Sequence, residues 1–420
     1  MREEEEGARP RWQNAVEITR VAKYDEEEAS VLKRALEAAR RAAEASDEAL
    51  DIVIVHSLAG GTGSGLGSRV VEALRSEMFR RNFILSSAVA PDIGGDTILQ
   101  SYNAALTLEK LTEHCDGVAL FRNGPLIDGL GKGAAPAFGG GGGARGRRGP
   151  RVGLEDVNSY VAAGLLGSLL PVRGVSAPMC PTRLQNLLAQ VAPHSKCKLF
   201  DVSMASLSMA HAPLGTQAST WTDLSRKLAP VLNAHSSDRE YPTSAATAVT
   251  AWGLDVDAMP DHPDPRAPPS HQPTDTREKE ALWTGAVLGS VMRHSGLRHL
   301  DWAAEQVVAE TSPNSPACVS HELGGGGAVG PRGRGAAAPR NCLEGRHQTL
   351  TVASNRLDVA DFVRSVHARG TELVGVGAYV HWYEKYGVER QNIEGAMDSL
   401  ADIVDDYYSA HGRGSPFGAG

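Results

Sequence analysis

The chain has 420 residues, with 42 basic against 50 acidic side chains and a formal net charge of −8. That length provides for about two or three domains with a sizeable core, and the acidic balance predicts no nucleic-acid partner. The five cysteines are widely spaced and form no CxxC pair, which favours reduced thiols over a disulfide framework or a zinc site. Because no apolar run is long enough for a bilayer and the acidic start is unlike a secretory signal, we expect a soluble intracellular protein with no membrane partner.

The first third of the chain alternates between helical and strand-like patterns. Apolar residues recur at helical spacing from Tyr24 to Glu48, which predicts an amphipathic surface helix. An apolar strand at 51–55 then runs directly into the glycine-rich segment 57–67, and the pattern is helical again over 68–80. Further along we predict a strand at 83–89, a helix at 98–113 and a strand at 118–121. This order of elements predicts an α/β fold with a doubly wound sheet.

The rest of the chain is interrupted by segments of biased composition. Residues 131–153 and 324–340 are rich in glycine and arginine and Pro260–Pro273 is rich in proline, so we predict insertions or loops there. Between and after them we predict a helix at Leu154–Leu170, strand-like segments at Ala281–Met292 and Thr349–Ala353, and closing helices at Asp358–Tyr379 and Asn392–Ser409. The predicted domains are a partial nucleotide-binding domain at 1–153, a central helix with an intermediate domain at 154–355, and a C-terminal helical region at 356–420.

The glycine loop between the first strand and the next helix is the main candidate site. Backbone N–H groups and the positive end of a helix can cradle phosphate there, and the glycines allow positive φ and close approach to an anion. No Gly-Lys-Ser/Thr follows, and the spacing does not fit GxGxxG, so other phosphate-loop classes are disfavoured. Composition alone leaves an ordinary glycine-rich turn as an equal alternative. The candidate residues are Ser57, Ala59, Gly60, Gly61, Thr62, Gly63, Ser64 and Gly65, with Thr62 and Ser64 as hydroxyl donors.

The whole run from His56 to Gly67 resembles the signature phosphate loop of the tubulin superfamily in its delta and gamma forms. The segment that starts at Asp96 resembles the ribose-contacting loop and following helix of tubulins, so the resemblance implies that Asp96 meets the ribose. Gln100 then stands where alpha- and beta-tubulin usually place Glu.

Two asparagines extend this resemblance to the base. Asn123 and Asn158 match the pair that reads the guanine edge in tubulins, and an amide can both donate to and accept from guanine. Each asparagine taken alone is more often a turn or capping residue. Leu154 occupies the place of an aromatic residue that stacks on the base.

A second match lies near the end of the chain, where residues 377–389 resemble the region that joins the last long helices of tubulins and are closer to delta-tubulin. The resemblance implies a tubulin-like fold with a parallel-sheet GTP-binding domain lacking its first strands, a central helix, an α+β intermediate domain and C-terminal helices. It implies GTP, with Mg²⁺, as ligand, other tubulins and microtubules as partners, and a cytoskeletal role at the centriole or basal body in cilium assembly. A gamma-like microtubule-nucleating subunit, a free-standing α/β GTPase and a degenerate fragment without ligand remain alternatives.

Two absences bear on mechanism. Nothing in Met1–Lys23 resembles the strand, GQxxNQ loop and acidic magnesium-side loop that precede this region in tubulins, so we expect an incomplete N-terminal segment, magnesium ligands outside this chain and weak GTP binding. The stretch Val172–Leu188, which matches the place where tubulins supply an acid to the neighbouring subunit, contains Arg183 and Gln185 but no Asp or Glu. The sequence therefore indicates no catalytic residue, and it favours binding and assembly over turnover.

Overall fold

The structure is a computed structural model that describes residues 26–46, 50–91, 99–133, 152–170, 183–208, 217–234, 243–254, 259–264, 266, 268, 271–300, 307–312 and 347–417. The chain packs into two compact units, and each is discontinuous in sequence. The first combines the described residues up to Arg122 with His194–Leu199 and those from Val359 onward; the second combines Asn123–Pro193 with Phe200–Asp358. The three-domain division at 153 and 355 stays a prediction.

The first unit contains three parallel strands in the order β1 (Ile52–Ser57), β2 (Ile84–Ala90) and β3 (Gly117–Arg122). β3 is buried along its whole length and β2 almost so, as expected of apolar strands covered on both faces. The three strands coincide with the segments predicted from the sequence, and the predicted α/β class is confirmed.

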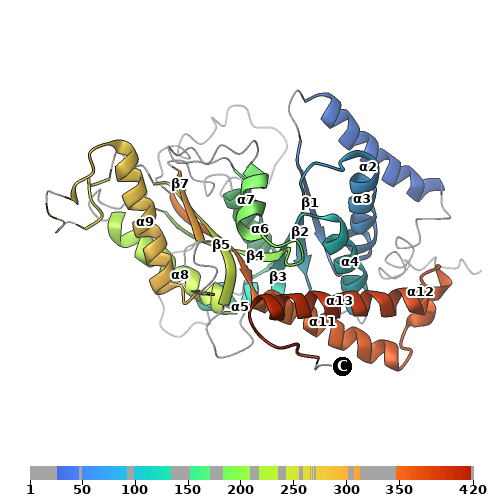
Figure 1. Ribbon diagram of the computed structural model, residues 1–420. Helices are drawn as coiled ribbons and strands as arrows, with labels where there is room; N and C mark the ends of the chain where they lie inside the picture. The colour runs from blue at the N-terminus through green and yellow to red at the C-terminus, as the bar shows by residue number, and fades with distance from the viewer. Residues whose placement is uncertain are drawn as a thin grey trace, which may run out of the picture. The chain divides into compact units, whose positions relative to one another are not determined.

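Helices cover this sheet (Figure 1). The helices of this unit are α2 (Glu26–Glu44), α3 (Gly67–Ala73), α4 (Gln100–His114), α11 (Leu357–Gly375), α12 (Val380–Lys385) and α13 (Arg390–Ala410), with π-helical turns η1 (Thr62–Leu66) and η2 (Leu74–Met78) flanking α3. α3 and α4 pack against each other and against the strands, and α13 packs on α4. All five helices predicted for this unit are present.

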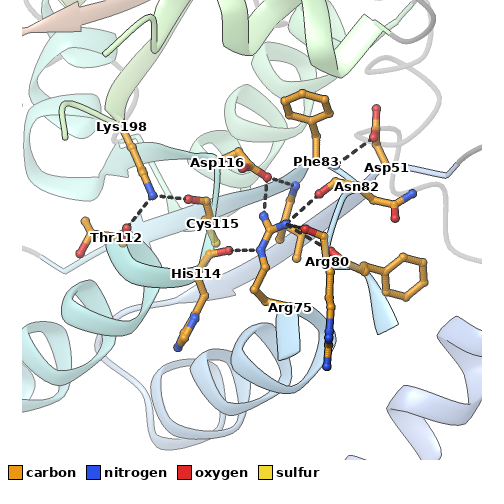
Figure 2. Close-up of polar contacts among 12 residues, drawn as sticks. Asp51, Arg75, Arg80, Asn82, Phe83, Thr112, His114, Cys115, Asp116 and Lys198 are labelled. Atoms are coloured by element: carbon orange, nitrogen blue, oxygen red, sulfur yellow. Dashed lines mark hydrogen bonds and ion pairs between the residues drawn. The ribbon is translucent and has the colours of Figure 1, made fainter. Parts of the chain in front are cut away.

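A polar cluster fixes the edge of the sheet at which the strands begin (Figure 2). Arg75 donates to three backbone carbonyls of the loop 79–82, at 3.0 to 3.3 Å, and forms an ion pair with Asp116. The same carboxylate accepts the backbone N–H of Ile84 at 2.8 Å, at the first residue of β2. Lys198 donates to carbonyls at the end of α4, and burial lowers the pKa of its ammonium group. This edge is thus held by side chains, which leaves the opposite edge for the glycine loop.

The second unit is built on a mixed sheet. β8 (His347–Arg356) lies between β4 (Leu199–Ser208) and β5 (Thr243–Trp252) and is antiparallel to both, while β6 (Arg298–His299) and β7 (Val307–Ser312) pair in parallel with β5. Its helices are α5 (Asn123–Gly133), α6 (Leu154–Leu169), α7 (Arg183–Val191), α8 (Gln217–Ala234) and α9 (Thr276–His294). α6 and β8 match predicted elements, whereas α5 was not predicted and reaches into the start of the segment 131–153.

The strand-like prediction for Ala281–Met292 is wrong, because this stretch lies inside α9. Asp275 caps the helix by accepting the backbone N–H of Glu278 at 2.7 Å. Trp283, Val287 and Val291 then recur every four residues and face the core beside α8, which is helical rather than strand spacing.

Some predictions fall wholly or partly outside the described residues. Residues 134–151 and 313–346, which hold most of the two glycine- and arginine-rich segments, lie outside them. The described part of Pro260–Pro273 contains neither α-helix nor strand, as predicted. Within the described ranges, no helix combines the length and apolar character that a bilayer span requires.

A fully buried ion pair organises the second unit. The Arg356 guanidinium donates to the Asp201 carboxylate, and its other nitrogen donates to the carbonyl of Leu232 at 2.9 Å. Asp201 also accepts the hydroxyl of Ser354 at 2.8 Å. Both charged side chains are essentially inaccessible to solvent, so each depends on the other for its solvation.

We predict that Arg356→Met lowers the free energy of unfolding by about 3–5 kcal/mol, because it leaves the Asp201 carboxylate buried without its counter-charge. The double variant Arg356→Met/Asp201→Leu should recover only part of that loss, since it removes both charges of this pair but leaves Asp358, 3.4 Å from Arg356, without its counter-charge. Urea denaturation measures the change, with Arg369→Met in the exposed Arg369–Glu372 pair as the control expected to change little. An Arg356→Met protein as stable as wild type would contradict the assignment.

Candidate functional site

The glycine loop follows directly on β1 and turns at once into a helix. Leu58 still donates to Val89 of β2 at 3.0 Å, and the N–H of Ala59 is turned toward the Ser57 hydroxyl at 3.3 Å. The first helical hydrogen bond runs from the N–H of Ser64 to the carbonyl of Gly60, at 2.8 Å. The N–H groups of residues 61–63 precede that bond, so the helix itself provides no acceptor for them. They form a cluster of donors at a helix N-terminus.

Among the glycines of the loop, Gly63 is required for space, and no loop glycine is required for positive φ. None of Gly60, Gly61, Gly63 and Gly65 has a positive φ, which corrects the expectation from the sequence. A Cβ at Gly63 would lie 2.6 Å from the carbonyl oxygen of Ser57 and 2.8 Å from its nitrogen. A Cβ at Gly60 would meet nothing within 4 Å. The loop is therefore tight against its own strand at Gly63 and open on the side of Gly60.

The two predicted hydroxyl donors differ in exposure. Thr62 is exposed, whereas Ser64 is 3% exposed and its hydroxyl lies 3.5 Å from the carbonyl of Gly61. In this conformation Thr62 presents the accessible hydroxyl, and Ser64 faces the helix.

His56 lies directly beneath the loop. Its Nε2 is 2.9 Å from the Ser86 hydroxyl, and a Cβ at Gly67 would lie 3.2 Å from its ring. Burial lowers the pKa of the imidazole, so the ring is neutral at pH 7 and adds no positive charge to the loop. The anion-binding potential of this turn consequently comes from backbone dipoles.

Asn103, on α4, holds the loop to the C-terminal helices. Its Nδ2 donates to the carbonyl of Ala59 at 3.2 Å, and its Oδ1 accepts the hydroxyl of Tyr383 at 2.7 Å. The neighbouring Tyr102 donates to the carbonyl of Ala378 at 3.0 Å and packs edge-on against the Tyr383 ring. Burial raises the pKa of Tyr102 to about 12, so it remains a donor at neutral pH. Both ends of this network lie in segments that resemble tubulin.

Asn103 was not among the residues predicted from the sequence. One observation could have identified it: Asn103 is a polar residue on a stretch of α4 in which Gln100 to Ala105 are all buried. A buried amide needs partners, and here a loop carbonyl and a phenol hydroxyl provide them.

The residues predicted to meet the nucleoside are distributed over both units. Gln100 is the first residue of α4 in the first unit and is buried, while Asp96 lies outside the described residues. Asn123 begins α5 in the second unit. On α6 of the same unit, Leu154 is 66% exposed and Asn158 is exposed one turn later, so both lie on one accessible helix face. Their roles in reading the base stay predictions.

The loop fits a phosphate group better than it fits a metal ion. The donors of residues 61–63 and the open space beside Gly60 suit an anion. Within the residues that the structure describes, no group of three or more His, Cys, Asp or Glu side chains is placed to hold a metal. Among the described residues we therefore place no Mg²⁺ ligand.

Comparison with known proteins finds similarity over the segment that contains the loop. Residues 19–131 match the model of the Tubulin/FtsZ family, GTPase domain. The chain is 40% identical over 75 residues to the tubulin gamma chain of Eremothecium gossypii, which covers 18% of this chain and 16% of that protein. It is 35% identical over 102 residues to the tubulin beta-1 chain of Glycine max, covering 24% and 23% respectively. The beta chain of Saccharomyces cerevisiae is 34% identical over the same length.

Residues 19–131 are thus similar to the GTPase domain of the Tubulin/FtsZ family, and the glycine loop lies inside the matched segment. The chain spans less than a quarter of the length of the curated relatives it matches. The similarity to known proteins thus covers the segment that contains the loop.

We predict that Gly63→Ala destabilises the protein by about 1–3 kcal/mol, because the new methyl group overlaps the backbone of Ser57. Gly60→Ala has open space and should leave stability unchanged or slightly higher. Thermal unfolding of the two variants beside wild type measures the difference. Equal melting temperatures for the two variants would show that the loop does not pack on its strand as described.

Proposed function

We propose that this chain binds GTP through residues 57–65 and serves as an assembly subunit of the tubulin type. The observation that carries the proposal is the abrupt strand-to-helix turn with open N–H donors at residues 61–63, in a segment that matches a Tubulin/FtsZ GTPase domain. A helix N-terminus alone does not identify the anion it binds, but the match to a GTPase-domain model points independently to a nucleoside triphosphate.

The proposed nucleotide contacts divide by chemistry. Residues 60–64 receive the phosphates through backbone N–H groups and the Thr62 hydroxyl, and the helix dipole adds to that attraction. Asp96 and Gln100 serve the ribose side. Asn123 and Asn158 read the guanine edge, with Leu154 giving an apolar surface in place of a stacking ring. Mg²⁺ accompanies the negatively charged triphosphate of GTP, and its protein ligands come from outside the described residues.

Nucleotide turnover should be slow. α7 is the described part of the stretch in which tubulins carry their assisting acid, and residues 183–188 include no carboxylate. Glu310 of β7 does reach α7, but its carboxylate is paired with Arg183, and both side chains are about nine-tenths buried. Arg183 also donates to the carbonyl of Ser168 at 3.1 Å and the Thr250 hydroxyl at 3.1 Å. A carboxylate held in this way is not available to orient a water molecule in a neighbouring subunit.

At a finer level, we propose a delta-type role in which the protein joins centriole or basal-body microtubules during cilium assembly. The support is the resemblance of residues 377–389, together with their attachment to the loop through Asn103 and Tyr102. The identity to a tubulin gamma chain favours a second candidate, a subunit that nucleates microtubules.

Replacing Gly60 by valine should weaken GTP binding at least tenfold, because the side chain fills the open space next to the phosphate donors. Ligand-observed NMR with GTP, and with ATP in parallel, detects binding even when it is weak. Gly285→Val is the matched control, since Gly285 is also open to space but lies on α9. Equal GTP signals from wild type and Gly60→Val would reject the loop as the phosphate site, and equal binding of ATP would reject guanine recognition.

Tagged protein in a ciliated cell should concentrate at a centriole marker, and purified protein should sediment with microtubules. The rate of GTP hydrolysis per protein molecule should not rise with protein concentration, because no carboxylate is available to complete the site of a neighbouring subunit. Diffuse staining with concentration-dependent turnover would contradict the delta-type role. Shortening of the lag in microtubule assembly would instead favour the gamma-type candidate.

A further inference from the structure

A cavity of about 430 Å³ lies in the second unit between α8 and α9, outside every residue assigned to the nucleotide. That volume is within the range of small-molecule pockets, roughly 300–1,000 Å³. Its wall from α9 is one face of the helix, residues 283, 286, 287, 290 and 293, which recur at spacings of three and four. Trp221 and Thr222 from α8 and the loop residues Pro263 and Asp264 complete the lining.

Two indole rings dominate the apolar part of this lining. Trp221 and Trp283 are 3% and 2% exposed and belong to the same core cluster as Val287. The hydroxyls of Ser225 and Ser290, 3.1 Å apart, tie the two helices together beside them. Flat, rigid walls of this kind favour a planar ring as occupant.

Two donor side chains of the cavity lining have no partner among the described residues. The Trp283 indole donates to the carbonyl of Pro260 at 3.0 Å, but the buried Trp221 Nε1 has no acceptor. Arg293 is exposed at the rim and forms no ion pair with any carboxylate of the described residues. The lining also contains acceptors: the Asp264 carboxylate, which accepts the backbone N–H of Arg266 at 2.9 Å, and the hydroxyls of Thr222 and Ser290. An occupant that supplies an acceptor and a negative charge would give partners to these two donors.

We propose that this cavity is a binding site for a planar aromatic anion, with the rings against Trp221 and Trp283 and the anionic group at Arg293. The Trp221 N–H becomes a donor to the same molecule when the indole adjusts to it. The site is separate from the GTP site proposed for residues 57–65, and it does not depend on nucleotide binding.

The probe is 1-anilinonaphthalene-8-sulfonate, an aromatic anion, and its neutral counterpart is N-phenyl-1-naphthylamine. Wild-type protein should bind the sulfonate with increased, blue-shifted fluorescence that excess GTP leaves unchanged. Arg293→Gln should weaken sulfonate binding about three- to tenfold, the effect of one charge-assisted contact at an exposed rim, and leave the neutral probe unchanged. Arg277→Gln, on the exposed first turn of the same helix, is the matched control.

Ala286→Trp and Thr222→Trp fill the cavity from α9 and α8 respectively, and each should reduce binding of both probes at least tenfold. Circular dichroism identifies a variant that fails to fold, and the other then provides the test. Sulfonate binding that survives both filled variants, that Arg293→Gln does not change, or that GTP displaces would overturn the proposal.

Discussion

The position of Gly63 against the backbone of Ser57 is the constraint on which the first unit depends. A methyl group at Gly63 would come within 2.6 Å of the Ser57 carbonyl, so the chain can reverse here only without a side chain. The helix consequently starts on top of the strand that precedes it, and its first N–H groups gather at the carboxyl end of the sheet. Open α/β sheets generally bind their ligands at this edge. Local sterics thus determine where an anion can be held.

The loop is secured from the other side by a buried amide. Asn103 is the point at which the turn, α4 and the C-terminal helices meet, since it contacts both Ala59 and Tyr383. A second contact joins α13 to the first residue of β4, where the Tyr407 hydroxyl accepts the N–H of Leu199 and donates to its carbonyl. The C-terminal helices are therefore part of the same unit as the loop, although more than 250 residues separate them from it in sequence. A movement of the loop would therefore act first on Tyr383, through Asn103, and on the turn before α12.

The sequence predicted best where structure follows from local pattern. The strands of the first unit are short, largely apolar segments, and α2, α4, α11 and α13 have clear helical periodicity, so their positions could be predicted closely. α9 was misread because its apolar residues are interspersed with glycine and small residues, and its cap at Asp275 went unrecognised. The closeness of Gly63 to Ser57 and the partners of Asn103 could not be predicted, because both are distances between segments that only the folded chain defines. The Arg183–Glu310 ion pair could not be predicted for the same reason.

The contrast between α2 and α4 shows how function can be read from burial rather than from composition. α2 is highly charged, and its pairs, such as Arg40 with Glu37 and Glu44, are exposed and contribute little to the fold. α4 carries Gln100, Asn103 and Thr107 in its interior, where unpaired polar groups would be costly. Thr107 is satisfied within its own helix, but Asn103 is satisfied only by the loop and by Tyr383. A leucine at Asn103 would fill the same space and bury more apolar surface, yet it would release the loop. The polar residue is therefore best explained by the need to position residues 59–63, which is the need of a binding site.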